Sequence, residues 1–353
     1  MKNYIFFLLG LILFLHTACE NTNNEDKLFP MKKNVVFTKM NVKENIGKIN
    51  LMKCVNNYIV ITGKNLDFQT QCQLIDKETK DSYYFGITGD GPGRLMQSVS
   101  IMPLSDKQIG IYDLGKRSLF SFSIDSIIRN GSAYQPEVRF NIIDFTPLNI
   151  GYLDNNTYIA TGVSNEVKRF MILDGNGKIH SMEGELPPKI QEKTSNILHS
   201  YAYWGQLTTN TKKRRIAICT NYAGIIQTYD LTKNEVQLIK EHNLFYADYD
   251  DNGGNLGINA RTRWGYLSID SNDKYIFVLY SGMNQMGNEH NGAFSRSNRI
   301  HIFDWNGNPV CLIISNIKLQ KICVDNKHLY GYSDEIEDIV IASIKDMVTT
   351  QEF

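Results

Sequence analysis

The chain has 353 residues, with 37 basic and 37 acidic side chains and therefore no formal net charge at pH 7. Proteins that bind nucleic acid usually carry a marked basic excess, so this balance argues against nucleic acid as a partner. The longest basic run, Lys212 to Arg215, lies between a polar stretch and an apolar strand, which predicts a solvated hairpin turn. No linker rich in Pro or Ser divides the chain, so we expect one folded domain.

The N-terminus carries the pattern of a secretory signal. Lys2 precedes an apolar run from Tyr4 to Leu15, and small residues follow it. A transmembrane helix needs roughly 20 apolar residues, and this run is too short for one. The sequence therefore predicts a signal peptide over residues 1–18.

The residues after the apolar run are similar to the end of a bacterial lipobox. Thr17 and Ala18 precede Cys19, which would be lipidated and become the first residue of the mature protein, although His16 stands where a typical lipobox has Leu. The polar residues behind Cys19 have nothing to pack and predict a flexible tether over 19–33. Their acidic side chains are similar to the signals that send Bacteroidota lipoproteins to the cell surface. We expect an outer-membrane lipoprotein that faces the periplasm or the cell surface.

The other cysteines do not form the pattern of a disulfide framework. They are odd in number, and each lies inside or beside an apolar run typical of a strand: Cys54, Cys72, Cys219, Cys311 and Cys323. A disulfide framework needs paired cysteines in a short chain. We interpret these residues as small buried hydrophobic side chains, with one bridge left open.

The body of the chain contains a repeated pattern. In each copy an apolar strand ends in Asp, a short polar turn follows, and a second apolar strand comes next. The aspartates are Asp76, Asp113, Asp174, Asp230 and Asp304. Asp with a following Gly, Asn or Lys supplies turn chemistry, so each copy predicts a β-hairpin. A further short apolar strand precedes each hairpin, and a sixth, incomplete unit occupies 321–344.

Six units of about 50 residues are the size of propeller blades. The sequence thus predicts an all-β fold, a six-bladed β-propeller over 34–348, with few helices. The strand-like segment 34–42 belongs to no unit. We expect it to lie beside the final strand and close the ring, which would remove an exposed sheet edge.

The stretch "GDGPG" at 89–93 has two possible roles. Glycine-rich loops before a helix can cradle phosphate through their backbone N–H groups. Pro92 removes one such donor, and the residues that follow are β-rich. We therefore expect a turn that links the first blade to the second.

Four stretches together resemble a known family. "GDGPGRL" precedes "IGIYDLGKRSLFSFSI", and "GYLSIDSNDKYIFVLYSG" precedes "SNRIHIFDWNGNPVCLI". They are similar to the TolB-like six-bladed propeller lipoproteins of Bacteroidota, over most of residues 34–345. The resemblance implies a propeller and a lipid anchor, and no established activity. The acidic residue that usually ends the Gly-Pro-Gly element of the family is replaced here by Arg94.

One loop has part of a calcium-binding pattern. Asp248, Asp250 and Asn252 follow the first half of the EF-hand spacing, but the twelfth position is Asn259 instead of Glu, and no helices flank the loop. We favour a solvated turn and no cofactor, with calcium as the weaker alternative.

Two further segments are candidates for binding. The long insertion 281–298 in the fifth blade carries Glu289, His290 and Arg296, and long loops of this kind are more often functional than inert. The other segment is "NARTRWGYLSI" at 259–269, which carries Arg261, Arg263 and Trp264 where it enters a strand candidate. Arg with Trp suits recognition of carboxylates or sugars. The alternative is that Trp264 wedges between blades and the arginines are solvated.

Two classes of function remain. The first is a lipid-anchored, non-catalytic binding or scaffold protein with an unknown protein or glycan partner. The second is a lactonase- or lyase-like enzyme that uses a divalent metal at the mouth of the propeller channel. Carboxylates and asparagines that converge on one channel mouth would favour the enzyme.

Overall fold

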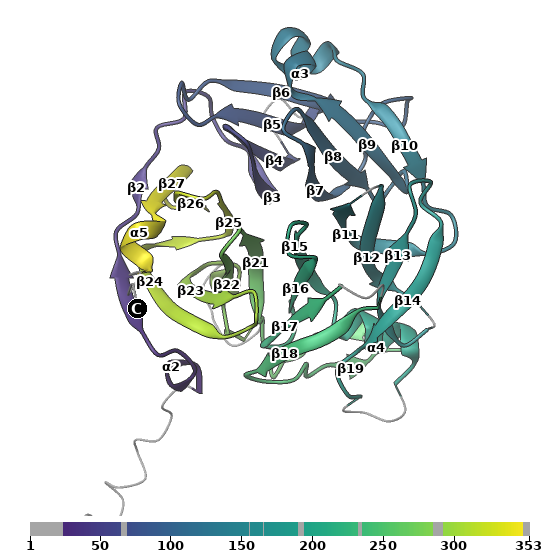
Figure 1. Ribbon diagram of the computed structural model, residues 1–353, viewed down its shortest axis with the longest axis vertical. Helices are drawn as coiled ribbons and strands as arrows, with labels where there is room; N and C mark the ends of the chain where they lie inside the picture. The colour runs from purple at the N-terminus through teal and green to yellow at the C-terminus, as the bar shows by residue number, and fades with distance from the viewer. Residues whose placement is uncertain are drawn as a thin grey trace, which may run out of the picture.

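The computed structural model describes residues 24–64, 69–154, 156–164, 166–189, 194–231, 235–284 and 292–348. Six β-sheets stand around a central axis as the blades of a propeller (Figure 1). One strand of each blade lies next to the axis, and the others follow outward. The predicted all-β, six-bladed propeller is confirmed.

The first four blades each have four antiparallel strands. The first contains β3 (Lys48–Val55), β4 (Tyr58–Lys64), β5 (Thr70–Asp76) and β6 (Ser82–Ile87). The second contains β7 (Ser98–Ser105), β8 (Gln108–Asp113), β9 (Ser118–Ser123) and β10 (Glu137–Asn141). The third contains β11 (Thr146–Asp154), β12 (Thr157–Val163), β13 (Lys168–Leu173) and β14 (Ile179–Glu185). The fourth contains β15 (Gly205–Asn210), β16 (Arg215–Thr220), β17 (Ile225–Asp230) and β18 (Gln237–Asn243).

The last two blades combine strands from both ends of the chain. The fifth contains β21 (Tyr266–Ser271), β22 (Tyr275–Tyr280), β23 (Ser297–Asp304) and β24 (Pro309–Leu319), and β1 (Lys32–Val35) is added outside β24. The sixth contains β25 (Lys321–Val324), β26 (His328–Ser333) and β27 (Asp338–Ser343), with β2 (Thr38–Lys39) as its outer strand.

Short elements lie between or outside the blades. The helices are α2 (Asn24–Leu28), α3 (Ile124–Asn130), α4 (Asn196–Ala202) and α5 (Ile344–Met347), with the 3₁₀ turns η1 (Gly131–Ala133) and η2 (Ala293–Ser295). A small hairpin joins β19 (Asp250–Asp251) to β20 (Leu256–Gly257). Within the described ranges, no helix is long and apolar enough to cross a membrane.

The aspartates of the repeat sit at hairpins, as predicted. Asp76 ends β5, and its Oδ1 accepts hydrogen bonds from the backbone N–H groups of Glu78 at 2.8 Å and Thr79 at 2.9 Å. Four of the five aspartates end or directly follow the third strand of a blade, whereas Asp113 ends the second strand of its blade. Asp113, Asp174 and Asp304 also accept from backbone N–H groups of their turns, and Asp230 pairs with Arg215 at 3.0 Å.

The glycine-rich stretch is a turn between blades, also as predicted. It lies between β6 and β7 and is not followed by a helix. Gly93 has a φ of +67°, and a Cβ there would come within 2.5 Å of the Gln135 side chain. Only glycine fits this backbone without displacing its neighbour.

The N-terminal segment spans two blades instead of one. β1 runs parallel to β24 of the fifth blade, and β2 pairs antiparallel with β27 of the sixth. We expected all of 34–42 beside the final strand. Thr38 and Lys39 pair there and the Met40 N–H donates to Ile339 O at 2.8 Å, but Asn34 and Val35 pair with β24 instead. Between the two strands Phe37 turns inward, and its backbone N–H donates to Asn316 Oδ1 at 2.7 Å.

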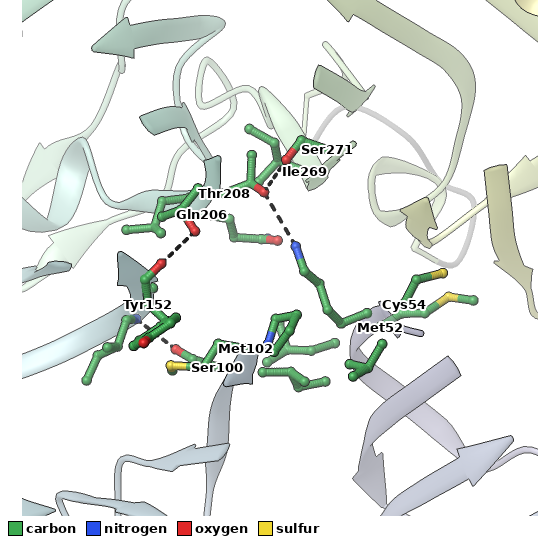
Figure 2. Close-up of a pocket in the computed structure, with 18 of the residues that line it drawn as sticks. Met52, Cys54, Ser100, Met102, Tyr152, Gln206, Thr208, Ile269 and Ser271 are labelled. Atoms are coloured by element: carbon green, nitrogen blue, oxygen red, sulfur yellow. Dashed lines mark hydrogen bonds between the residues drawn. The ribbon is translucent and has the colours of Figure 1, made fainter. Parts of the chain in front are cut away.

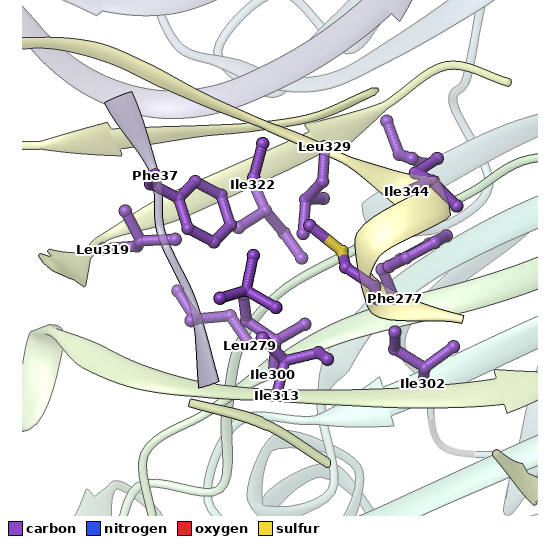
Figure 3. Close-up of a cluster of buried hydrophobic side chains, with 14 of the residues drawn as sticks. Phe37, Phe277, Leu279, Ile300, Ile302, Ile313, Leu319, Ile322, Leu329 and Ile344 are labelled. Carbon is purple, nitrogen blue, oxygen red and sulfur yellow. The ribbon is translucent and has the colours of Figure 1, made fainter. Parts of the chain in front are cut away.

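Phe37 belongs to the hydrophobic cluster between the fifth and sixth blades (Figure 3). Its side chain is 2% exposed and lies with Leu319 and Ile322, while its neighbour Val36 points outward and is 69% exposed. Burial of apolar surface is the main force that holds such blades together. The N-terminal segment therefore contributes a core side chain as well as strand pairing.

The residues before β1 are also docked. In α2, Glu25 is 4% exposed, and Phe29 packs against the rings of His301 and Phe303 at centroid distances of 4.7 and 5.3 Å. The flexible tether expected over 19–33 therefore does not include residues 24–33. Cys19 and the predicted signal peptide lie outside the described residues.

Candidate functional site

The innermost strands of the six blades surround a central channel. A cavity of about 390 Å³ lies between them and is lined by residues of β3, β7, β11, β15, β21 and β25 (Figure 2). Polar side chains such as Ser100, Gln206 and Thr208 face it alongside Met52 and Met102. The channel is therefore a mixed polar and apolar space and not a packed core.

A buried ion pair crosses this channel. The Nζ of Lys53 on β3 contacts the carboxylate of Asp270 on β21, and Asp270 is fully buried. The same Nζ lies 3.4 Å from Thr208 Oγ1 on β15. Burial raises the pKa of Asp270 above its usual value, and Lys53 opposes that rise. Backbone N–H groups of Ser271 and Val324 also donate to Asp270, at 2.7 and 2.9 Å. This carboxylate is thus already occupied by protein donors.

A larger cavity of about 780 Å³ opens where the inner strands begin. We call it the mouth cavity. Its lining combines aromatic, amide and charged side chains, including Trp204, Trp264, Tyr266, Tyr332, Gln97, Asn149, Gln206, Asn221, Gln320, Lys48, Lys321 and Asp334. It shares Leu51, Asn149, Gln206 and Lys321 with the channel cavity, so a ligand in the mouth would reach toward the axis.

Lys321 is the charged group that these two cavities share. It is the first residue of β25, and its Nζ donates to the backbone oxygen of Leu267 at 2.9 Å. No carboxylate of the described chain lies within ion-pair distance of it. Burial lowers the pKa of Lys321 to about 8. This half-buried ammonium group therefore has a backbone oxygen as its partner but no carboxylate.

Three buried polar atoms in the lining also lack partners. The Trp204 indole N–H, the Asn221 amide oxygen and Asp334 Oδ1 have no hydrogen-bond partner among the described residues. The backbones of Trp204 and Asn221 are joined, since the Asn221 N–H donates to the Trp204 oxygen at 3.0 Å. An unpaired buried donor or acceptor costs about 1–3 kcal/mol. Such groups are typical of a site that a ligand or ordered water completes.

Trp264, one of the predicted binding residues, lines the mouth cavity. Its ring stacks on Phe294 with centroids 5.4 Å apart and is tilted against Tyr222 at 5.1 Å. Arg296 contributes indirectly, because it pairs with Asp334 of the lining at 2.7 Å. The structure thus brings Trp264 and Arg296 to the same cavity edge.

The other predicted residues lie elsewhere. The Arg263 guanidinium covers the Phe245 ring at 4.1 Å, and its Nε donates to Gly282 O at 3.1 Å. Arg261 is exposed and faces the loop discussed next. Glu289 and His290 lie outside the described residues, although the insertion that holds them does connect β22 to β23.

Arg261 is bound to the loop that resembles half of an EF-hand. Its guanidinium lies 3.1 Å from Asp248 and 3.3 Å from Asp250, and Asn259 Nδ2 donates to the other oxygen of Asp250 at 2.8 Å. Protein donors therefore already satisfy both carboxylates of the weak calcium candidate Asp248, Asp250 and Asn252. Across the described ranges, no group of three or more His, Cys, Asp or Glu side chains could hold a metal ion.

Sequence reasoning missed the residues of the channel itself. Lys53, Asp270 and Lys321 each stand as a single charge inside a short apolar strand: "LMKCV", "LSIDS" and "KICV". A charge in such a strand is uncommon unless it is paired or faces a cavity. That signal could have identified them. Trp204 lines the mouth cavity as well.

Comparisons with known proteins agree with this architecture. A family model described as TolB-like 6-blade propeller-like matches residues 50–327. No curated protein matches the chain. A crystal structure of an exported protein from Bacteroides fragilis is similar, with 12% identity and a TM-score of 0.55, over 88% of this chain and 94% of that one. A DUF4221 member from Bacteroides vulgatus has 10% identity and a TM-score of 0.50, over 89% and 96%.

Proposed function

Because the chain belongs to the TolB-like six-bladed propeller family, we propose that it is a non-catalytic binding protein of the bacterial envelope. In this proposal Cys19 carries the lipid that holds the protein at the outer membrane. The mouth cavity takes a protein or glycan ligand. The predicted signal peptide and lipobox support this location, and the fold neighbour from Bacteroides fragilis is described as exported.

The observation that carries the proposal is the composition of the mouth cavity. Binding sites are concave and mostly pre-formed, with a few converging polar groups among apolar and aromatic ones. The mouth cavity has this character, since Trp264 and Trp204 lie beside Asn221 and Lys321. The unpaired indole N–H and amide oxygen provide hydrogen-bonding groups for a ligand.

The channel supports binding better than it supports metal-dependent catalysis. A lactonase- or lyase-like site needs several carboxylates or amides around one cation. Among the described residues Asp106 is the acidic residue that lines the channel cavity. The buried carboxylate of Asp270 is already occupied by Lys53 and two backbone N–H groups. The amides of the mouth meet part of what a cation site needs, but its lining holds one carboxylate, Asp334, beside two lysines, Lys48 and Lys321, which would repel a divalent cation.

The test is a binding survey with matched variants. The protein without its predicted signal peptide is applied to an array of neutral glycans, acidic glycans and peptides. Trp264→Ala and Asn221→Ala should each weaken binding by about tenfold or more, because they remove a face and a polar contact of the cavity. Tyr246→Ala, which removes an aromatic side chain that is 43% exposed and outside the cavity, should bind like wild type.

Circular dichroism of each variant verifies that the fold is intact. Two outcomes would contradict the proposal. One is that both mouth variants bind normally, and the other is that nothing on the array binds to the wild type.

A further inference from the structure

The charge of the mouth cavity points to one class of ligand. Its lining carries two lysines, Lys48 and Lys321, and one carboxylate, Asp334. Arg296 offsets the charge of Asp334, since it lies 2.7 Å from Oδ2, and Gln320 Nε2 donates to the same oxygen at 3.0 Å, while Oδ1 has no partner among the described residues. Among the described residues neither lysine has a carboxylate within ion-pair distance. The cavity therefore presents an excess of positive charge, although the whole chain is neutral.

The neutral groups of the lining suit a carbohydrate. Asn149 is 7% exposed and Asn221 is 3% exposed, and both line the cavity with Gln206. Amide side chains both donate and accept, which matches hydroxyl groups. Aromatic rings such as Trp264 offer a flat apolar face with a polar edge. An acidic peptide would also use the lysines and pair its backbone with the amides, but a sugar ring in addition offers an extended face to the Trp264 indole.

We propose that the mouth cavity binds an acidic oligosaccharide, with a carboxylate of the sugar at Lys321. This ligand assignment rests on the proposed binding function and names the class of ligand that the mouth cavity takes. The sugar hydroxyl groups would pair with Asn149 and Asn221, and one ring would lie on the tryptophan side of the cavity. Lys321 attracts an anion only while its ammonium group is protonated. Since burial lowers the pKa of Lys321 to about 8, binding of the acidic sugar should weaken as pH rises above that value.

The probes are an oligosaccharide of galacturonic acid, its methyl ester, a neutral galactose oligosaccharide and polyglutamate, measured by calorimetry. The acidic sugar should bind about tenfold or more tightly than its ester, since the ester keeps the rings and loses the charge. Lys321→Gln should remove that preference, so that the acid and its ester bind with about equal affinity. Lys327→Gln, which removes an exposed lysine at the opposite end of the channel, should keep the preference of the wild type.

The outcomes separate this proposal from the proposed function. Equal binding of acid and ester, or tighter binding of polyglutamate, would overturn the ligand class. If Trp264→Ala still abolished binding in that case, the mouth would remain a binding site. If Trp264→Ala and Asn221→Ala bound every probe like wild type, both proposals would fail.

A second, independent observation concerns two thiols at the seam of the ring. Cys54 is on β3 of the first blade and Cys323 is on β25 of the last, and their sulfur atoms lie 3.3 Å apart. A disulfide has a sulfur–sulfur distance of about 2.05 Å, so a small rotation of both side chains brings them to bonding distance. Cys54 borders the channel, whereas Cys323 is fully buried. The first is therefore the thiol that an oxidant can reach.

We infer that Cys54 and Cys323 form a disulfide that links the first blade to the last in an oxidising compartment. The oxidant is a disulfide, either small or carried by an oxidoreductase. The Cys54 thiolate attacks it, forms a mixed disulfide and releases one thiolate. The Cys323 thiolate then attacks Cys54 Sγ and releases the second. The pair loses two electrons and two protons, and the donor gains both as two thiols.

Burial raises the pKa of the Cys323 thiol well above its usual value, so the second step is the slow one. The native protein is incubated with oxidised glutathione, blocked with N-ethylmaleimide and digested for mass spectrometry. We expect a Cys54–Cys323 peptide and a higher urea midpoint than after reduction. Cys54→Ser should lose this difference, and Cys219→Ser should keep it. Full alkylation of Cys54 and Cys323 after that treatment would overturn the inference.

Discussion

The carboxylate of Glu25 and the ring Nε2 of His301 lie 2.7 Å apart in a fully buried contact, although 276 residues separate them in the sequence. The other oxygen of Glu25 lies 2.6 Å from Arg299 Nη1. Phe29 covers the same histidine ring. The first part of the described chain, which includes Glu25 and Phe29, is thus fixed to the fifth blade by both charge and packing.

This contact predicts that stability falls on acidification. Burial lowers the pKa of His301, although its hydrogen bond to Glu25 opposes this. In the unfolded chain a histidine titrates near pH 6.5. As pH falls below that value the unfolded state binds more protons than the folded state, so stability is lost. The urea midpoint of the wild type should therefore decrease as the pH is lowered from about 7.5 to 5.5. The decrease should be smaller for His301→Gln.

Burial also lowers the pKa values of His199 and His242, so these residues contribute with the same sign. His301→Gln should therefore reduce the pH dependence without abolishing it. If the variant and the wild type lost stability in parallel, His301 would not be one of the titrating groups.

Phe37 should stabilise the packing between the fifth and sixth blades. Phe37→Ala removes a buried ring and should destabilise the protein by about 3–5 kcal/mol, as measured by urea unfolding. Val36→Ala, one residue earlier, removes a side chain that is 69% exposed and should change stability by less than about 0.5 kcal/mol. Similar effects of the two variants would mean that Phe37 is not packed as described.

Removing one partner of the Lys53–Asp270 ion pair should destabilise the protein. Lys53→Met leaves Asp270 buried without its counter-ion and should reduce the free energy of unfolding by about 3–5 kcal/mol. Adding Asp270→Asn removes the stranded charge and should recover part of the loss, which a double-mutant cycle measures. A loss below about 1 kcal/mol for the single variant would show that solvent, not Lys53, stabilises the carboxylate.

Cys19→Ser tests the anchor. A serine cannot carry the thioether-linked lipid, so the variant should remain unprocessed or be released from the membrane fraction. Metabolic labelling with a fatty acid and fractionation of the cells measure both effects. Unchanged labelling of the variant would refute lipidation at Cys19.

The loop that contains Asp248 and Asp250 should not need calcium to fold. Arg261 and Asn259 already satisfy its carboxylates. A chelator should therefore leave the melting temperature unchanged within about a degree, and added calcium should not raise it. A fall of several degrees with chelator would show that a cation competes successfully with Arg261.

The architecture was predictable because its signals are local. Asp76, Asp113, Asp174 and Asp304 satisfy turn donors a few residues away, so hairpin chemistry appears in a short window of sequence. The six-fold repeat then implies the ring. The position of Gly93 in a turn between blades follows from the same local reasoning.

The functional site was only partly predictable because it is assembled from distant residues. Trp264 could be selected by its chemistry, but nothing near it in sequence indicates that Lys321 and Asn221 share its cavity. The docking of Glu25 was missed because a polar segment was expected to be solvated, whereas His301 and Arg299 provide buried partners far along the chain.

The pairing of β1 with β24 and of β2 with β27 determines when the protein can finish folding. The N-terminal strands are synthesised first, yet their partners lie in the last part of the chain. Contacts of such long sequence separation form slowly. A chain that leaves the cytoplasm N-terminus first would therefore cross the membrane with its ring still open, and these two blades could be completed only after the C-terminal strands had emerged.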